Sequence, residues 1–168
     1  DVNVGLPDID EVQMMKDVVT QLQSVTSLPL QIDTVDAKAM EAAMRIYNGK
    51  PMLNSVSGKQ ESMNAVFPLV KQYGGVVVGL TLDEQGIPSD ADGRVKIAGK
   101  IIEEAAKYGI RKKDIVIDVL TMTISSEKDG AKVTLEALRK VREIYGVRTV
   151  LGVSNISFGL PKRPVINS

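Results

Sequence analysis

Polar side chains recur in this sequence at the points where short apolar, β-prone runs end. A carboxylate can accept two parallel N–H bonds, and an asparagine side chain can donate or accept. Carboxylates and carboxamides that face one cavity, without histidine, cysteine or a basic phosphate cradle, would suit a neutral, hydrogen-bond-rich heterocycle such as an amino-pyrimidinone. The polar residues at these run ends are Asn3, Asp33, Asn54, Asp83, Asp118, Ser154 and Asn155.

Each of these residues also has an ordinary structural interpretation. Asp33 could start a turn, Asn54 could form an Asx-turn, and Asp83 could belong to a solvated loop. Asp118 is different, because apolar residues flank it on both sides. An ionised carboxylate without a partner would be costly there, so we expect a donor to Asp118 from the protein or from a ligand.

The runs that carry these residues alternate with segments of helical periodicity, which is typical of a parallel sheet with crossover helices. The expected strands are Val2–Gly5, Pro29–Asp33, Pro51–Ser55, Val76–Leu82, Ile115–Leu120 and Thr149–Val153. The expected helices are Asp10–Ser24, Asp36–Tyr47, Lys59–Tyr73, Asp92–Tyr108 and Gly130–Tyr145.

Helix ends are marked by residues with known end preferences. Asp8 or Asp10 can cap the first helix and Asp36 the second, since a carboxylate accepts the free N–H groups of a first turn. Three expected helices end in a Tyr-Gly pair, and glycine suits the left-handed position just past a helix.

Two architectures fit this alternation, an open doubly wound sheet and a (β/α)8 barrel. A barrel brings every strand end to one face, where such enzymes carry their chemistry. An open sheet gathers ligand contacts at a switch point, usually beside a Gly-rich phosphate loop, and neither G-x-G-x-x-G nor G-x-x-x-x-G-K-[ST] occurs here. We therefore favour the α/β barrel, present as about six of its eight units.

Composition narrows the function classes. Of 168 residues, 43% are hydrophobic, and 21 basic residues balance 21 acidic ones, so no net charge attracts nucleic acid or an anionic membrane. The chain has no cysteine and no histidine, which excludes serine-histidine, cysteine-histidine and zinc-histidine chemistry within it. The absence of cysteine is compatible with a cytoplasmic location, and no apolar run approaches membrane-spanning length.

Several stretches together resemble one family. They are "DVNVGLPDIDE", "PLQIDT", "NGKPMLNSVSGK", "VVVGLTLDEQGIP", "DIVIDVL" and "VLGVSNISFGLPKR". In combination they are similar to the pterin-binding (folate) domain of cobalamin-dependent methionine synthase and of methyltetrahydrofolate:corrinoid methyltransferases. The resemblance extends over essentially the whole chain and implies a pterin-binding (β/α)8 barrel.

The resemblance also implies a function and its residues. The domain would bind 5-methyltetrahydrofolate and present its N5-methyl group to cob(I)alamin, which a separate corrinoid-carrying domain or protein would supply. By position in the motifs, Asp33, Asn54 and Asp118 would hold the pterin, and Asn155 would lie by N5 as the catalytic residue. Further binding residues implied in this way are Asn3, Gly152, Ser154 and Arg163.

The same resemblance leaves alternatives open. A dihydropteroate synthase shares the pterin pocket, but its "G-x-S-R-K" strand end is replaced here by "G-V-S-N", and a non-catalytic pterin-binding fragment is also consistent. Val119 stands where the family pattern has Pro. Relative to the family, a first strand and a last βα unit are missing, so we expect residues 1–168 to form a partial barrel domain of a longer chain. A homodimer is left open.

Overall fold

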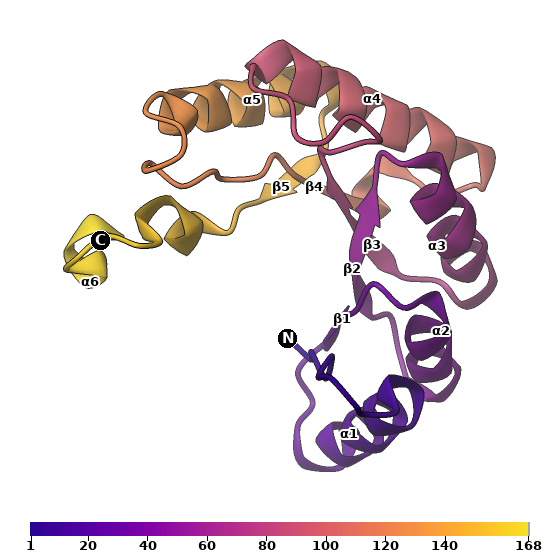
Figure 1. Cartoon of the computed structure of the whole chain (residues 1–168). Helices are drawn as coiled ribbons and strands as arrows, with labels where there is room; N and C mark the ends of the chain where they lie inside the picture. Colours follow the sequence, from indigo (N-terminus) through magenta and orange to yellow (C-terminus); the bar gives the residue numbers. More distant parts are fainter. Residues whose placement is uncertain (168) are drawn as a thin grey trace.

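Five parallel strands form one sheet in chain order, β1-β2-β3-β4-β5, with helices between them (Figure 1). The structure is a computed structural model that describes residues 1–167. The strands are β1 (Gln31–Asp33), β2 (Met52–Ser57), β3 (Val76–Leu80), β4 (Ile115–Asp118) and β5 (Arg148–Val150). Sequential order without a reversal is the order of a barrel wall, and it lacks the switch point of a doubly wound sheet.

The helices confirm the expected alternation. They are α1 (Glu11–Val25), α2 (Ala37–Ile46), α3 (Gln60–Tyr73), α4 (Ala91–Lys107), α5 (Gly130–Tyr145) and the short α6 (Arg163–Ile166). Two 3₁₀ segments, η1 (Lys112–Asp114) and η2 (Val153–Ser157), were not expected from the sequence.

Helix ends follow the residue types that marked them. Asp10 and Asp36 cap α1 and α2 by accepting the N–H groups of Gln13 and Lys38 at 3.1 and 2.8 Å. The helix α4 begins one residue earlier than expected, because Asp90 caps it through the N–H of Gly93 at 2.8 Å. The predicted helix-ending glycines all have positive φ: Gly74 at 77°, Gly109 at 81° and Gly146 at 65°.

The first and last expected strands differ most from the prediction. Val2–Gly5 is not a full strand, since only Val2 bridges Ile32, through hydrogen bonds to the backbone on either side of Ile32. The expected Thr149–Val153 strand ends at Val150, because the chain turns at Gly152 into η2. The residues of β5 are exposed or half-buried, and the strand pairs with β4 on one side. Few contacts therefore stabilise a longer strand.

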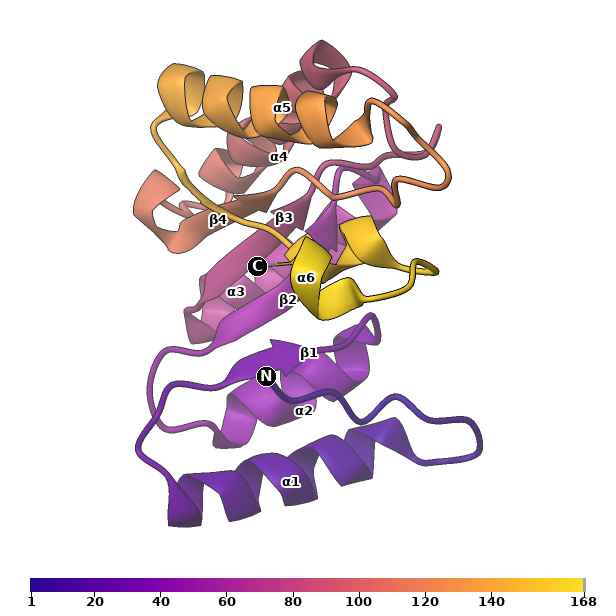
Figure 2. The same cartoon turned by 90° about the vertical axis from the view of Figure 1, so that its left-hand side faces the viewer.

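The two faces of the sheet have different surroundings. Ile32, Leu53, Val77 and Ile115 are level with one another in the register and fully buried, because they lie under the helices. Each helix in turn buries an apolar stripe on that face, such as Met40 and Met44 of α2. On the opposite face Val78 and Val116 are buried, whereas Asp33, Asn54 and Asp118 are half-buried, and no helix from α1 to α5 covers this face (Figures 1 and 2).

A network of polar contacts ties the loops at the carboxyl ends of β2 and β3. The Lys100 ammonium donates to the Gly58 carbonyl at 2.6 Å and lies 3.6 Å from the Glu84 carboxylate. Glu84 also accepts the N–H of Gln60 at the start of α3, and this hydrogen bond is the main cause of its lowered pKa. The Gly58 N–H donates to the Leu82 carbonyl at 2.7 Å, so the two loops are held together along their backbones.

Gly58 is the position where this packing leaves no room for a side chain. A Cβ at Gly58 would lie 2.5 Å from Ile97 Cγ2 and 2.9 Å from the Leu82 carbonyl oxygen. We predict that Gly58→Ala lowers the free energy of unfolding by about 1–3 kcal/mol, because backbone must shift to admit the methyl group. Urea unfolding followed by circular dichroism measures this.

Gly5→Ala is the matched control, since its Cβ would have 3.6 Å to the nearest atom. A Gly58→Ala variant as stable as Gly5→Ala would contradict the close approach of α4 to this loop.

Candidate active site on the open face of the sheet

Three of the sequence-predicted site residues lie on the sheet face that the helices leave open. Asp33 and Asn54 are Cα partners at the ends of β1 and β2, so their side chains point to the same side. The same register row continues through Val78 to Val116, and Asp118 lies two residues beyond Val116 on the same face. Asp33, Asn54 and Asp118 thus share one sheet face, and their convergence in a binding site stays a prediction.

The spacing of these three residues follows from the sheet itself. Neighbouring strands are separated by about 4.8 Å and residues along a strand by about 3.3 Å. Asp118 is therefore about 10 Å from Asn54 across the sheet and about 7 Å further toward the carboxyl ends of the strands. Between them lie Val78 and Leu80 of β3, which give the floor of the site an apolar patch bordered by polar groups.

Asp118 has the donor that the sequence required, and it comes from the protein. The Leu120 N–H donates to Asp118 Oδ1 at 2.8 Å, from a residue with φ of 63°. Burial raises the pKa of the Asp118 carboxyl, and the Leu120 hydrogen bond opposes that rise. The carboxylate is half-buried and accepts this one hydrogen bond within residues 1–167, so it retains capacity for N–H donors of a ligand.

The end of β1 is fixed by a buried threonine. The Thr34 hydroxyl donates to the Glu11 carboxylate in the first turn of α1, and it accepts the Asp36 N–H at 3.0 Å. The Thr34 N–H donates to the Asn54 carbonyl at 2.9 Å. These contacts set the chain direction immediately after Asp33 and join it to β2.

Asn3 lies beside this strand end, since Val2 bridges Ile32. Its side-chain oxygen accepts the N–H of Gly5 at 3.1 Å, and the residue is exposed. Asn3 thus stabilises its own loop, and its role in binding stays a prediction.

The remaining predicted residues lie in the segment after β5, on the side of the sheet opposite α2 and α3 (Figures 1 and 2). Asn155 and Ser154 are exposed in η2, and a Cβ at Gly152 would lie 3.1 Å from Asn155 Nδ2, so the Asn155 side chain lies over Gly152. The Arg163 guanidinium donates to the Ser154 carbonyl at 2.9 Å and to the Ser157 hydroxyl at 3.2 Å.

Arg163 therefore stabilises η2. Its guanidinium carbon also lies 5.7 Å from the centre of the Phe158 ring, which adds a cation–π contact to this segment. Within residues 1–167 no hydrogen bond or ion pair joins Asn155 to Asp33, Asn54 or Asp118. The structure places η2 and the sheet residues as two separate parts of the candidate site.

The two parts are linked through the loop after β4. The Ile124 N–H donates to the Ile156 carbonyl at 3.1 Å, which connects the loop that follows Asp118 to the residue next to Asn155. This contact is a backbone hydrogen bond between apolar residues, and nothing in the sequence pattern indicated it.

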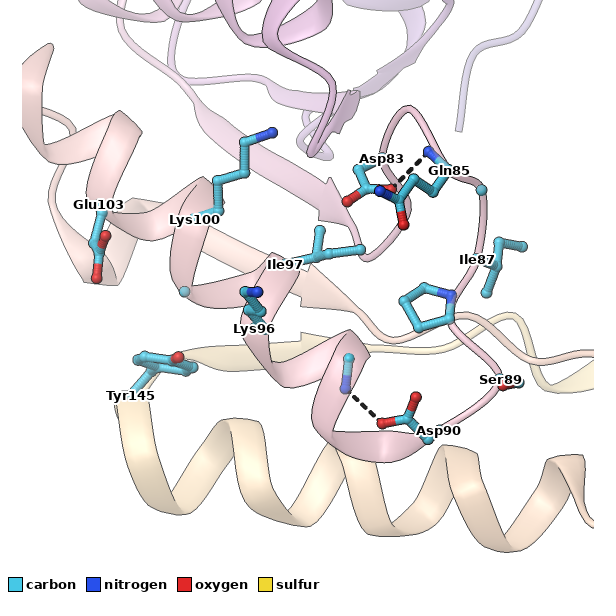
Figure 3. A pocket seen from close by; sticks show the side chains of 14 residues that line it. Asp83, Gln85, Ile87, Ser89, Asp90, Lys96, Ile97, Lys100, Glu103 and Tyr145 are labelled. Atoms are coloured by element: carbon cyan, nitrogen blue, oxygen red, sulfur yellow. Dashed lines mark hydrogen bonds between the residues drawn. The ribbon is translucent and has the colours of Figure 1, made fainter.

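One hollow on the surface lies outside this site. It has a volume of about 730 Å³ and lies between α4 and the loop after β3, where Figure 3 shows Asp83, Lys96 and Tyr145 around it. Asp83 turns its carboxylate to the N–H of Gln85 at 2.9 Å, as expected for a loop residue. A hollow of about 490 Å³ lies at the carboxyl end of β2 beside the start of α3; its lining includes Ser55, Ser57 and Leu80 but none of Asp33, Asn54 and Asp118.

Sequence reasoning missed the buried Arg94 of α4. Its side chain is fully buried, on the same helical stripe as Ala98, Ile101 and Ala105. The signal was present, since an arginine on the apolar stripe of an amphipathic helix must find several acceptors inside the protein.

Residues 1–167 contain no cluster of acidic residues, histidine or cysteine that could hold a metal ion. No helix within the same residues is long and apolar enough to cross a membrane.

Comparison with known proteins decides the family. The sequence pattern of the pterin binding enzyme family matches residues 4–166. The chain belongs to the pterin-binding enzyme family. Asp33, Asn54 and Asp118 thus lie at the carboxyl ends of strands of a barrel wall, on the face that no helix from α1 to α5 covers.

Curated relatives of this pterin-binding domain are methyltransferases. The methionine synthase of Mycobacterium leprae is 34% identical over 168 residues, which cover 92% of this chain and 14% of that protein. The methylcorrinoid:tetrahydrofolate methyltransferase of Eubacterium limosum is 31% identical over 170 residues, which cover 99% of this chain and 63% of that protein. The chain therefore spans less than two thirds of the length of either relative.

A solved structure shares the fold. The dihydropteroate synthase of Xanthomonas albilineans, in complex with indole-2-carboxylic acid and 6-chloroguanine, matches with a TM-score of 0.63 and 23% identity. The match covers 99% of this chain and 62% of that one. Together with the sequential strand order, this match confirms the barrel architecture over the open doubly wound sheet, with this chain forming part of the barrel.

The raised pKa of Asp118 makes its charge a cost to the folded protein. Since the pKa of Asp118 is higher in the folded than in the unfolded protein, the protonated carboxyl contributes to the free energy of unfolding at low pH. This contribution is lost as pH rises through the folded-state pKa. We predict that Asp118→Asn raises the free energy of unfolding at neutral pH by up to about 1 kcal/mol, because the half-exposed carboxylate keeps part of its hydration. The difference in free energy of unfolding between Asp118→Asn and the unaltered protein should vanish as pH falls and Asp118 becomes neutral.

Denaturant unfolding at several pH values measures the effect, with Asp114→Asn as the control of opposite sign. The Lys50 hydrogen bond lowers the pKa of Asp114, so loss of that charge should destabilise the protein above the ordinary aspartate pKa. A destabilised Asp118→Asn protein at neutral pH would show that the carboxylate has a stronger internal partner.

Proposed function

We propose that this chain binds 5-methyltetrahydrofolate through its pterin ring and takes part in transfer of the N5-methyl group to cob(I)alamin. The observation that carries the proposal is the placement of Asp33, Asn54 and Asp118 on one open sheet face, in a pterin-binding domain with methyltransferase relatives. Two carboxylates and a carboxamide match the amino and amide groups of a pterin edge.

Asp118 is suited to the pterin N–H groups, because it combines partial burial with free acceptor capacity. Partial removal from water strengthens its hydrogen bonds to a bound ring. Asp33 and Asn54, side by side, would bind the other polar edge, and the apolar Val78 and Leu80 would contact the ring face.

Asn155 is proposed to act at N5. A methyl group on a tertiary amine leaves only when N5 carries or shares a proton, because the departing nitrogen takes the electron pair of the C–N bond. A neutral carboxamide does not supply that proton, but its oxygen can accept a hydrogen bond from N5–H. If this bond strengthens as charge develops, it stabilises the transition state more than the bound substrate.

The corrinoid is proposed to come from another domain or protein. The chain has no histidine to serve as a ligand to cobalt, and residues 1–167 contain no metal-binding cluster, so its residues do not fit a resident corrinoid. A corrinoid carried alongside would supply the cobalt nucleophile for the methyl group. The role of this chain is to hold the folate, orient N5 and accept its hydrogen bond.

The reverse direction of transfer is the second candidate, favoured by one relative. The Eubacterium limosum protein is named for transfer from a methylcorrinoid to tetrahydrofolate. The same residues would serve both directions, since a catalyst lowers one barrier for both. Assays started from either methyl donor measure the rate of transfer in each direction.

A dihydropteroate synthase-like reaction is the weaker alternative. That reaction expels a diphosphate and requires cationic side chains at the strand end that is Gly-Val-Ser-Asn here. The nearby Arg163 is engaged by the Ser154 carbonyl and the Ser157 hydroxyl.

We predict that Asn155→Ala slows methyl transfer about 10²–10³-fold while changing folate affinity only a few-fold, since it removes one preorganised contact at the charged transition state. Single-turnover transfer to added cob(I)alamin, followed by absorbance, gives the rate, and calorimetry gives the affinity. Asn64→Ala, an exposed asparagine on α3, is the control. Equal loss of rate and affinity would assign Asn155 to binding alone, and folate binding without any transfer by the unaltered protein would favour the non-catalytic alternative.

We predict that Asp118→Asn weakens folate binding about 10–100-fold, because one acceptor for the pterin N–H groups becomes a donor. Affinity of the unaltered protein should fall as pH drops through the raised pKa of Asp118, since protonation removes the same acceptor. Calorimetry across pH tests both. An affinity that is unchanged in the variant would remove Asp118 from the pterin site.

A further inference from the structure

Arg94 has the largest fully buried side chain among the residues that the structure describes. It lies in the first turn of α4, outside the sheet face described above. A buried guanidinium requires acceptors for its N–H groups, because it stays protonated inside a protein. The identity of those acceptors shows what this residue holds in place.

The acceptors lie on the two loops that follow β3 and β4 and on α5, and the Glu127 carboxylate lies 3.8 Å from Nη2. Nε donates to the Pro88 carbonyl at 2.9 Å, and Nη1 donates to the carbonyls of Val119 and Leu120 at 3.1 and 2.7 Å. Nη1 also lies 3.1 Å from the Thr134 hydroxyl, which itself donates to the Leu120 carbonyl at 3.1 Å. The Leu120 carbonyl is therefore held from two sides.

Val119 and Leu120 are the two residues that follow Asp118. Leu120 has φ of 63°, a left-handed conformation that is unfavourable for a side chain of this kind. In that conformation its N–H points back to Asp118 Oδ1 at 2.8 Å. The hydrogen bonds to the Leu120 carbonyl stabilise the peptide geometry that orients the carboxylate.

A second contact fixes the Asp118 backbone from the neighbouring strand. The Thr81 N–H donates to the Asp118 carbonyl at 3.1 Å, so the strand end itself is anchored independently of Arg94. The part that depends on Arg94 is thus the turn at Val119 and Leu120 and the direction of the carboxylate.

We propose that Arg94 is a positioning residue for pterin binding: its buried guanidinium holds the Val119–Leu120 turn in the conformation that orients the Asp118 carboxylate toward the open sheet face. This inference rests on the proposed function, in which Asp118 binds the pterin. Arg94 acts through Asp118 and does not touch the folate.

The test is a double-mutant cycle between positions 94 and 118. Lysine keeps the positive charge but cannot match the planar fork of arginine, so Arg94→Lys should release at least one loop carbonyl. Calorimetry measures the affinity for 5-methyltetrahydrofolate in the unaltered protein, Arg94→Lys, Asp118→Asn and the double variant. Arg139→Lys, an exposed arginine on α5, is the matched control.

If Arg94 acts through Asp118, Arg94→Lys weakens binding about tenfold in the presence of Asp118 and less than twofold when Asn occupies position 118. The loss of thermal stability should be the same in both backgrounds. In steady-state transfer, Arg94→Lys should raise KM with little change in kcat, as expected of Asp118→Asn and unlike Asn155→Ala.

The outcomes separate the two proposals. If Asp118→Asn weakens binding and Arg94→Lys reduces affinity equally in both backgrounds, Arg94 is only structural and this inference fails alone. If Asp118→Asn leaves affinity unchanged, the assignment of Asp118 in the proposed function fails, and the inference falls with it.

Thr134 provides a second pair of variants in case Arg94→Lys does not fold. Thr134→Val removes the hydroxyl on the Leu120 carbonyl at nearly constant shape, whereas Thr134→Ser keeps it. Thr134→Val should weaken folate binding only while Asp118 is present, and Thr134→Ser should restore most of the affinity. Equal affinities for the valine and serine variants would contradict the positioning of Asp118 through the Leu120 carbonyl.

Discussion

The alternation of side chains along parallel strands is the constraint on which this structure depends. Ile32, Leu53 and Ile117 are fully buried under the helices, so the next residue of each strand must point to the opposite face. Those next residues are Asp33, Asn54 and Asp118. Burial of the apolar set thus places the polar set, and a shift of one residue in any strand would exchange the two.

The sheet fixes the face on which the polar side chains lie, but it does not fix the direction of each side chain within that face. Beyond each strand end a loop sets the local geometry, and each loop is held by a polar contact from another element. Thr34 joins the β1 end to α1, Lys100 and Glu84 join the β2 and β3 loops, and Arg94 joins the β3 and β4 loops. Support of this kind comes from residues distant in sequence, because a loop has no repeating hydrogen-bond pattern of its own.

The difference between strand ends, which the sheet fixes, and loops, which distant residues hold, explains what the sequence could and could not predict. Strand ends and helix ends are local, so Asp36, Asp118 and the Tyr-Gly pairs were located from their neighbours alone. The length of β5 depends on packing with other elements, which the β-prone run "TVLGV" does not reveal. The expected strand therefore extended too far, and β5 ends before Gly152. The position of Arg94 on an apolar helical stripe indicates that its side chain is buried. Its partners could not be predicted, because Val119 and Leu120 are 25 and 26 residues away in the sequence.

The two parts of the candidate site are built in different ways, and this bears on their chemistry. Asp33, Asn54 and Asp118 lie on strands that are continuous with the buried core, so their backbone positions are set by the most stable part of the fold. Asn155 lies on a short 3₁₀ segment that the Ile124–Ile156 backbone hydrogen bond joins to the loop after β4 and that hydrogen bonds from Arg163 stabilise. Groups that bind the whole ring benefit from a rigid frame, whereas a group that acts at N5 needs only to reach that atom when the substrate is bound. The proposed function therefore implies that folate binding and methyl transfer can be altered separately, because different elements carry the residues proposed for each.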